Sequence, residues 1–136
     1  MHSTSNGKAR SKSELLEERL LEFAARVGKV VDALPETRLG RHIAGQLVRS
    51  GTAPAPNYAE ACSAESKKDF VHKLGIALKE IRETRIWLQL IVRAELLPLA
   101  RMQVLLDECE QLNRILGRSM ITAKSRRLRE QDKPPP

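Results

Sequence analysis

A regular repeat of apolar residues between positions 16 and 34 is the strongest constraint on how this chain folds. The repeat consists of Leu16, Leu20, Phe23, Val27, Val30 and Leu34, which are separated by alternating steps of four and three. That spacing places every member on one side of an α-helix and is typical of a helix that packs against others. With Ser13 as an N-cap and Pro35 as a stop, it predicts a helix over 13–34.

Three further segments share this helical period. The second begins near Thr37 or Arg38, falters at 50–52 and resumes after Pro54 and Pro56 to about Cys62, so we expect a kink there. The third runs from a cap at Ser66, and the fourth from Pro98 to about 123. The residues expected to face inward are Leu39, Ile43 and Leu47 in the second; Phe70, Leu74, Ala77, Ile81, Thr84, Leu88 and Ile91 in the third; and Met102, Leu106, Cys109, Leu112, Leu116 and Met120 in the fourth.

These segments predict one all-α domain, an antiparallel up-down-up-down four-helix bundle over 13–123. The total length of 136 residues suits a single core, and aromatic residues make up only 3% of the chain, which argues against an all-β domain. We expect residues 1–12 and 124–136 to be basic tails outside the bundle.

The net charge of +7 lies mostly in those tails. Residues 1–12 contribute +3 without an acid, and residues 124–136 contribute five bases against two acids, which leaves about +1 for the body. The candidate nucleic-acid contacts are therefore Lys8, Arg10, Lys12, Lys124, Arg126, Arg127 and Arg129. The alternative is that both ends are disordered and only solvate the protein.

The sequence carries no motif of an enzyme or of a cofactor or metal site. His2, His42 and His72 are scattered, and there is neither a Glu-x-x-His pair nor a glycine-rich phosphate loop. Cys62 and Cys109 are expected to be reduced structural thiols. Without a signal-peptide pattern or a long uncharged segment, we expect a non-enzymatic cytoplasmic protein with no membrane partner.

The segment from Ile86 to Val92 is apolar on nearly every side, unlike the rest of its helix. A helix of that kind needs burial on more than one face, so Ile86, Trp87 and Leu90 are candidates for an interface between subunits of a homo-oligomer. The alternative is that Trp87 lies over the end of its own bundle.

Two carboxylates, Glu80 and Glu83, share a stripe with Trp87. They fit an ordinary solvated face with helical ion pairs to Lys73, Lys79 and Arg82. They also fit a structural polar network that ties the junction before the third helix in place. That network would contain Arg49, Asn57, Glu60, Glu80 and Glu83.

Several short motifs give the chain a resemblance to a known family. They are Gln46-Leu-Val-Arg-Ser-Gly-Thr, Asn57-Tyr-Ala-Glu-Ala61, Ala64-Glu-Ser-Lys-Lys-Asp-Phe70, Ile76-Ala-Leu-Lys-Glu80, Arg82-Glu-Thr84 and Trp87-Leu88. Over about residues 14–123 the chain resembles the four-helix-bundle proteins encoded in intervening sequences of bacterial 23S ribosomal RNA genes. More distantly, around Arg114-Ile-Leu-Gly117, it is similar to the accessory variability protein of diversity-generating retroelements, a basic pentameric barrel. The resemblance implies a ring-shaped homo-oligomer, a pentamer.

Two function classes follow. One is an oligomeric nucleic-acid-binding or ribonucleoprotein accessory protein that contacts the phosphates of RNA or DNA through its basic tails, independently of base sequence. The other is a protein-interaction scaffold with a polypeptide partner and no nucleic-acid role.

Overall fold

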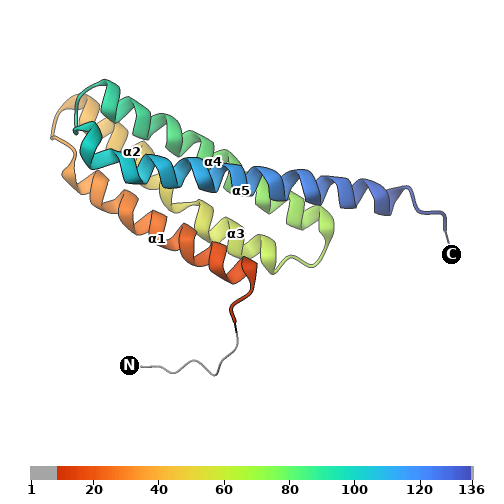
Figure 1. Cartoon of the computed structure of the whole chain (residues 1–136). Helices are drawn as coiled ribbons and strands as arrows, with labels where there is room; N and C mark the ends of the chain where they lie inside the picture. The colour runs from red at the N-terminus through yellow and green to blue at the C-terminus, as the bar shows by residue number, and fades with distance from the viewer. Residues whose placement is uncertain (1–8, 136) are drawn as a thin grey trace.

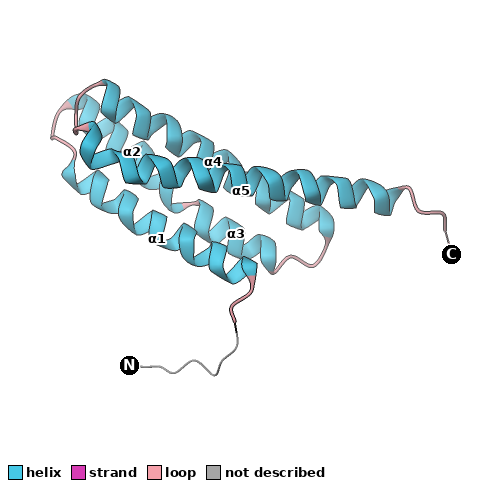
Figure 2. Cartoon of the chain, viewed as in Figure 1, coloured by secondary structure: helices cyan, strands magenta, loops and turns pink. Residues whose placement is uncertain are grey.

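The computed structural model describes residues 9–135 of the chain, which form helices and no strand (Figures 1 and 2). The helices are α1 (Lys12–Ala33), α2 (Arg38–Thr52), α3 (Pro54–Cys62), α4 (Lys67–Arg93) and α5 (Leu99–Gln131). Because α2 and α3 follow each other along one arm of the bundle, the chain makes four antiparallel passes: α1, α2 with α3, α4 and α5 (Figure 1). The predicted all-α, four-helix arrangement is therefore confirmed, with the second arm in two pieces.

The first helix begins two residues earlier than expected. Its N-cap is Ser11 and not Ser13: the Ser11 side chain accepts a hydrogen bond from the Glu14 backbone N–H, and the Glu14 carboxylate accepts one from the Ser11 backbone N–H. This reciprocal capping box satisfies two of the helix's free donors, which a cap at Ser13 would leave open. Lys12 is consequently the first helical residue and not part of a tail.

The break in the second arm falls at Ala53, and α3 starts directly with Pro54. The expected helical piece from Asn57 is therefore longer, because Pro56 lies in the first turn. The first four N–H groups of a helix have no partner within it, so the donors missing at Pro54 and Pro56 cost no hydrogen bond.

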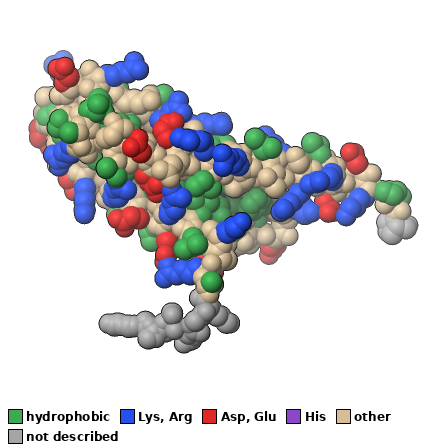
Figure 3. Space-filling model, viewed as in Figure 1, with side chains coloured by type: hydrophobic (Ala, Val, Ile, Leu, Met, Phe, Trp, Pro, Cys, Tyr) green, Lys and Arg blue, Asp and Glu red, His purple; other side chains and the backbone are tan. Residues whose placement is uncertain are grey.

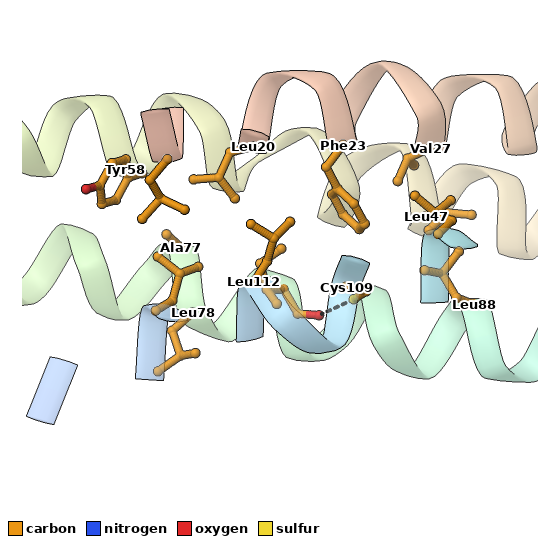
Figure 4. Close-up of a cluster of buried hydrophobic side chains, with 14 of the residues drawn as sticks. Leu20, Phe23, Val27, Leu47, Tyr58, Ala77, Leu78, Leu88, Cys109 and Leu112 are labelled. Carbon is orange, nitrogen blue, oxygen red and sulfur yellow. Dashed lines mark hydrogen bonds between the residues drawn. The ribbon is translucent and has the colours of Figure 1, made fainter. Parts of the chain in front are cut away.

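The core runs the length of the bundle and contains most of the predicted inward residues (Figure 4). Leu20, Phe23 and Val27 of α1 meet residues of the other helices there, and Cys109 of α5 lies with its Sγ 3.8 Å from the Ile81 carbonyl oxygen. An ion pair of 2.6 Å between Arg19 and Glu108 also ties α1 to α5. No helix in residues 9–135 has the length and the apolar character needed to cross a bilayer.

For two residues predicted to face the core, Leu39 and Leu106, the neighbouring residue is the buried one. Leu39 is 40% exposed, and Gly40 beside it is buried instead, since the backbone of Pro35 crosses so closely that a Cβ on Gly40 would lie 2.1 Å from the Pro35 carbonyl oxygen. In α5, Leu105 is buried while Leu106 is only partly covered. Phe70 likewise is partly buried and packs at the edge of the core.

The last helix is longer than the sequence period predicts. Instead of giving way to a tail at 124, α5 continues to Gln131 and projects past the bundle (Figure 1). Residues 124–131 contain no Gly or Pro, and a 2.9 Å ion pair between Lys67 and Glu130 fastens them to the first turn of α4. Helix propensity and this contact maintain the helix where the apolar stripe has ended.

Candidate functional site

The basic residues of the C-terminal segment lie on the projecting part of α5. Lys124, Arg126, Arg127 and Arg129 point to different sides of the helix because their positions differ by one to five residues. Within residues 9–135 none of the four takes part in an ion pair, whereas the acid among them, Glu130, is held by Lys67 and Lys133. The hydrogen bond from Lys67 is the main reason that the pKa of Glu130 is lowered. The projection therefore carries four cations that form no ion pair within the described residues, and Figure 3 shows Lys and Arg side chains along this part of the molecule.

The N-terminal bases differ from them. Lys8 lies outside the described residues. Arg10 pairs with Glu18 of α1, and Lys12 stands exposed in the first turn of that helix. The structure thus brings none of the described N-terminal bases together with the α5 cations.

A second group of cations lies on the body, where the sequence suggested near neutrality. Lys79 and Arg82 of α4 line a hollow with Lys124 of α5, beside Gly75 and Gly117. The helical ion pairs expected for Lys79 and Arg82 are absent from residues 9–135. These two cations were missed as candidate contacts because a charge sum over the whole body hides where the acids are.

The acids of that region, Glu80 and Glu83, are engaged on the side of α4 that faces α2. Arg49 of α2 donates hydrogen bonds of 3.1 Å to both carboxylate oxygens of Glu80 and also pairs with Glu83. Trp87 Nε1 donates to Glu83 at 3.1 Å, and the His42 ring meets Trp87 edge-on at 5.8 Å. The indole N–H, followed by the Arg49 guanidinium, lowers the pKa of Glu83.

The proposed polar network is divided in the structure. Arg49, Glu80 and Glu83 do come together, joining α2 to α4. Asn57, in contrast, donates to the Ala53 carbonyl at 2.9 Å within its own arm, and Glu60 of α3 pairs with Lys73 of α4 at 2.7 Å. Both contacts hold the junction in place, but neither residue reaches Glu80 or Glu83. Asn57 instead bonds to the backbone one turn earlier, and Glu60 pairs with a lysine nearer the start of α4.

The candidate interface residues have unequal exposure. Ile86 is 55% exposed on the outer side of α4, while Trp87 and Leu90 are partly buried and pack against the core. The apolar segment is therefore partly covered within one chain, as the alternative for Trp87 supposed, and Ile86 is the member left uncovered.

Within residues 9–135 no group of three or more His, Cys, Asp and Glu side chains is placed to hold a metal ion. Of the two cysteines, Cys62 is exposed and Cys109 is buried. Burial, followed by the charge of Glu110, raises the pKa of the Cys109 thiol to about 12, so this thiol is not a ready nucleophile.

Comparison with known proteins gives a consistent picture of the family. The fold matches a crystal structure, at 1.70 Å resolution, of a protein of unknown function from the S23 ribosomal protein family of Bacteroides thetaiotaomicron VPI-5482. That match has a TM-score of 0.72 and 32% sequence identity, and it covers 77% of this chain and 97% of the other. No functionally curated protein matches. The family model described as 23S rRNA-intervening sequence protein matches residues 16–118, and the chain belongs to that family.

Proposed function

We propose that this protein is a non-enzymatic accessory protein that binds RNA or DNA through phosphate contacts, independently of base sequence. The observation that carries the proposal is the set of four unpaired cations on the projecting end of α5. A rigid helix can hold arginine forks toward phosphates at a smaller loss of chain entropy than a disordered tail.

The contact surface extends beyond the ends. Lys79 and Arg82 on α4 lie beside Lys124, so the phosphates of a strand on α5 can continue along the body. A helix rises about 1.5 Å per residue, so the cations at 124–129 span about 7.5 Å, which matches roughly two phosphate steps of one strand along a duplex.

We further propose that the chain assembles into a ring-shaped homo-oligomer, a pentamer, as its family resemblance implies. Ile86 is the exposed residue of the apolar α4 segment and would be buried between subunits, next to Trp87 and Leu90. A ring would repeat the α5 cations around one assembly and raise its affinity for a long polyanion through multivalency.

Nucleic-acid binding is tested with a labelled oligouridylate and a labelled DNA duplex, whose fluorescence anisotropy is followed at several salt concentrations. Replacing Arg126, Arg127 and Arg129 with Ala should weaken both complexes and flatten the plot of log affinity against log salt by roughly 0.7 to 0.9 for each lost phosphate contact. The matched control replaces Arg38, Arg41 and Arg101 with Ala. These are three exposed bases at the opposite end of the bundle, so the control has the same net charge as the α5 triple variant.

If the two triple variants bind equally well, the α5 projection is not the nucleic-acid contact. If the parent protein binds neither probe at low salt, the nucleic-acid proposal is wrong, and the alternative function, a protein-interaction scaffold, takes its place.

The oligomer is tested by light scattering, which should give about five times the chain mass of 15.3 kDa. Ile86→Glu should dissociate the assembly without unfolding the chain, because the side chain is exposed within one subunit. Val104→Glu, at a 68% exposed position of α5, is the matched control and should keep the parent mass. A monomer mass for the parent protein would rule out the ring.

A further inference from the structure

A hollow of about 400 Å³ lies between the first turns of α4 and the C-terminal half of α5. It is lined by Lys67, Phe70 and Val71 of α4 and by Arg118, Ser119, Thr122, Ala123 and Arg126 of α5. Figure 1 shows α5 continuing past the N-terminal end of α1, and Figure 3 shows hydrophobic side chains gathered beneath this part of α5. The hollow is thus a place where two helices lie side by side without a third to cover them.

The floor of this groove is apolar and fixed in place. Phe70, Val71 and Ala123 are each partly buried and pack against the core of the bundle. Their outer surfaces remain available to a partner, and burying such surfaces favours binding through the hydrophobic effect. A preformed floor also reduces the entropy that a partner must lose on binding.

The rim of the groove is positively charged. Its charged lining residues are Lys67, Arg118 and Arg126, and no carboxylate lines it. Lys67 is engaged by Glu130, but Arg118 and Arg126 form no ion pair within the described part of the chain. These two arginines are eight residues apart on one helix, a rise of about 12 Å.

The two basic terminal segments of this protein are poor occupants of the groove. The projecting end of α5 in a second copy carries four bases against Glu130 between 124 and 131, and residues 1–12 carry three bases and no acid. Either segment would bring like charges against Arg118 and Arg126. A nucleic-acid strand would suit the charge and could reach Arg126 with a phosphate, but phosphates would leave the apolar floor of the groove unburied, and Phe70 is the sole aromatic lining residue on which a base could stack.

We propose that this groove binds an acidic amphipathic helix of another protein. Apolar residues at i, i+3 or i+4 and i+7 of that helix would rest on Phe70, Val71 and Ala123, as in helix-in-groove recognition. Carboxylates about two turns apart would reach Arg118 and Arg126, whose guanidinium groups can each take a carboxylate through two hydrogen bonds. The groove shares Arg126 with the proposed nucleic-acid contact, but the proposal rests on the apolar floor and on Arg118 as well and does not depend on nucleic-acid binding.

A charge-swap experiment tests the proposal. The probes are two labelled 18-residue helical peptides with the same leucine stripe, one flanked by Glu and the other by Lys, and a scrambled peptide with the composition of the Glu version. The parent protein should bind the Glu peptide at least about tenfold more tightly than the scrambled one. An Arg118→Glu, Arg126→Glu variant should exchange this preference and favour the Lys peptide.

The matched control reverses two charges at the other hollow between α4 and α5. The Lys79→Glu, Lys124→Glu variant changes the net charge by the same amount as the Arg118→Glu, Arg126→Glu variant. Its two residues line a different hollow, so it should keep the preference for the Glu peptide. Equal binding of the Glu and scrambled peptides by the parent protein, or an equal exchange of preference in both variants, overturns the proposal.

A neutral substitution separates a peptide from a nucleic acid. Thr122 is exposed on α5 and lines the groove, so Thr122→Trp should fill it without disturbing the core and should weaken the Glu peptide about tenfold. Ile121→Trp adds similar bulk on the other side of the helix and should leave peptide binding unchanged. Binding of a labelled oligouridylate should be unaffected by Thr122→Trp; if it falls while peptide binding does not, the occupant is a nucleic-acid strand and the peptide proposal is wrong.

Discussion

The hydroxyl groups of Ser50 and Thr84 share a hydrogen bond of 2.9 Å between α2 and α4, and both residues are fully buried. Thr84 also donates to the Glu80 carbonyl oxygen at 2.7 Å in its own helix. Thr84 Oγ1 is the donor in both contacts, so its single proton is shared between the Ser50 hydroxyl and the Glu80 carbonyl oxygen. The pair lets two polar side chains pack inside an apolar core with their hydrogen bonds satisfied.

Removing one partner of this pair should therefore cost more than removing both. Thr84→Val leaves the buried Ser50 hydroxyl without its hydrogen-bond donor and should lower the free energy of unfolding by about 1 to 3 kcal/mol. The double variant Ser50→Ala, Thr84→Val should lose less than the sum of the two single losses. Urea denaturation at one protein concentration gives the three values, and strictly additive losses would show that the hydroxyl groups are not coupled.

Gly51 lies where α2 packs tightly against α1. A Cβ at this position would lie 2.6 Å from Val27 Cγ1, and Val27 is fully buried with a stiff branched side chain. Gly51→Ala should therefore destabilise the protein by about 1 to 3 kcal/mol through overpacking. Gly45→Ala in the same helix meets nothing within 4 Å and should stabilise it by about 0.5 to 1 kcal/mol. Thermal unfolding of the two variants tests the pair, and a gain in stability for Gly51→Ala would contradict the close packing.

The parts of the fold that were predictable from sequence are those where an apolar stripe faces a core. The steps of three and four in 16–34 and 74–91 place the buried residues of α1 and α4, because burial of a helix face repeats with the helical turn. The capping box at Ser11 and Glu14 was also predictable from the spacing Ser-x-x-Glu, whereas Ser13 is followed three residues later by Leu16 and could supply only a simple side-chain cap.

The projecting end of α5 was not predictable from that pattern. A helix that leaves the bundle needs no apolar stripe, so its length depends on local propensity and on the contact between Lys67 and Glu130 from distant parts of the sequence. The same holds for the basic hollow at Lys79 and Arg82, since tertiary pairing decides which cations the acids neutralise.

The hydrogen bond from Trp87 to Glu83 makes a pH-dependent contribution to stability. The pKa of Glu83 is lowered from an ordinary value of 4.5, first by the indole N–H and then by Arg49. A lowered folded-state pKa stabilises the protein above the unfolded value, and this contribution is lost as the pH falls through the lower folded value. Glu83→Gln should therefore make the free energy of unfolding less dependent on pH below about 4.5.

Tryptophan fluorescence measures this titration directly, since Trp87 is the single tryptophan. In a His42→Gln background, which removes the ring edge-on to Trp87, emission should change with a midpoint below 4.5, and Glu83→Gln should remove this step. Glu80→Gln, which leaves the indole's acceptor intact, should retain it. A step that persists without Glu83 would assign the titration to another group.

The two cysteines should differ sharply in reactivity with a thiol reagent such as a disulfide dye. Cys62 is exposed and should react at once, whereas Cys109 is buried against the Ile81 carbonyl. Its pKa of about 12 keeps the thiol protonated, so raising the pH to about 9 should not speed its reaction in the folded protein. Cys109 should react only as fast as the core opens, and urea should bring its rate close to that of Cys62. A Cys62→Ser variant should thus show no fast phase, and a burst of two thiols per chain in the folded parent protein would mean that α5 does not cover Cys109.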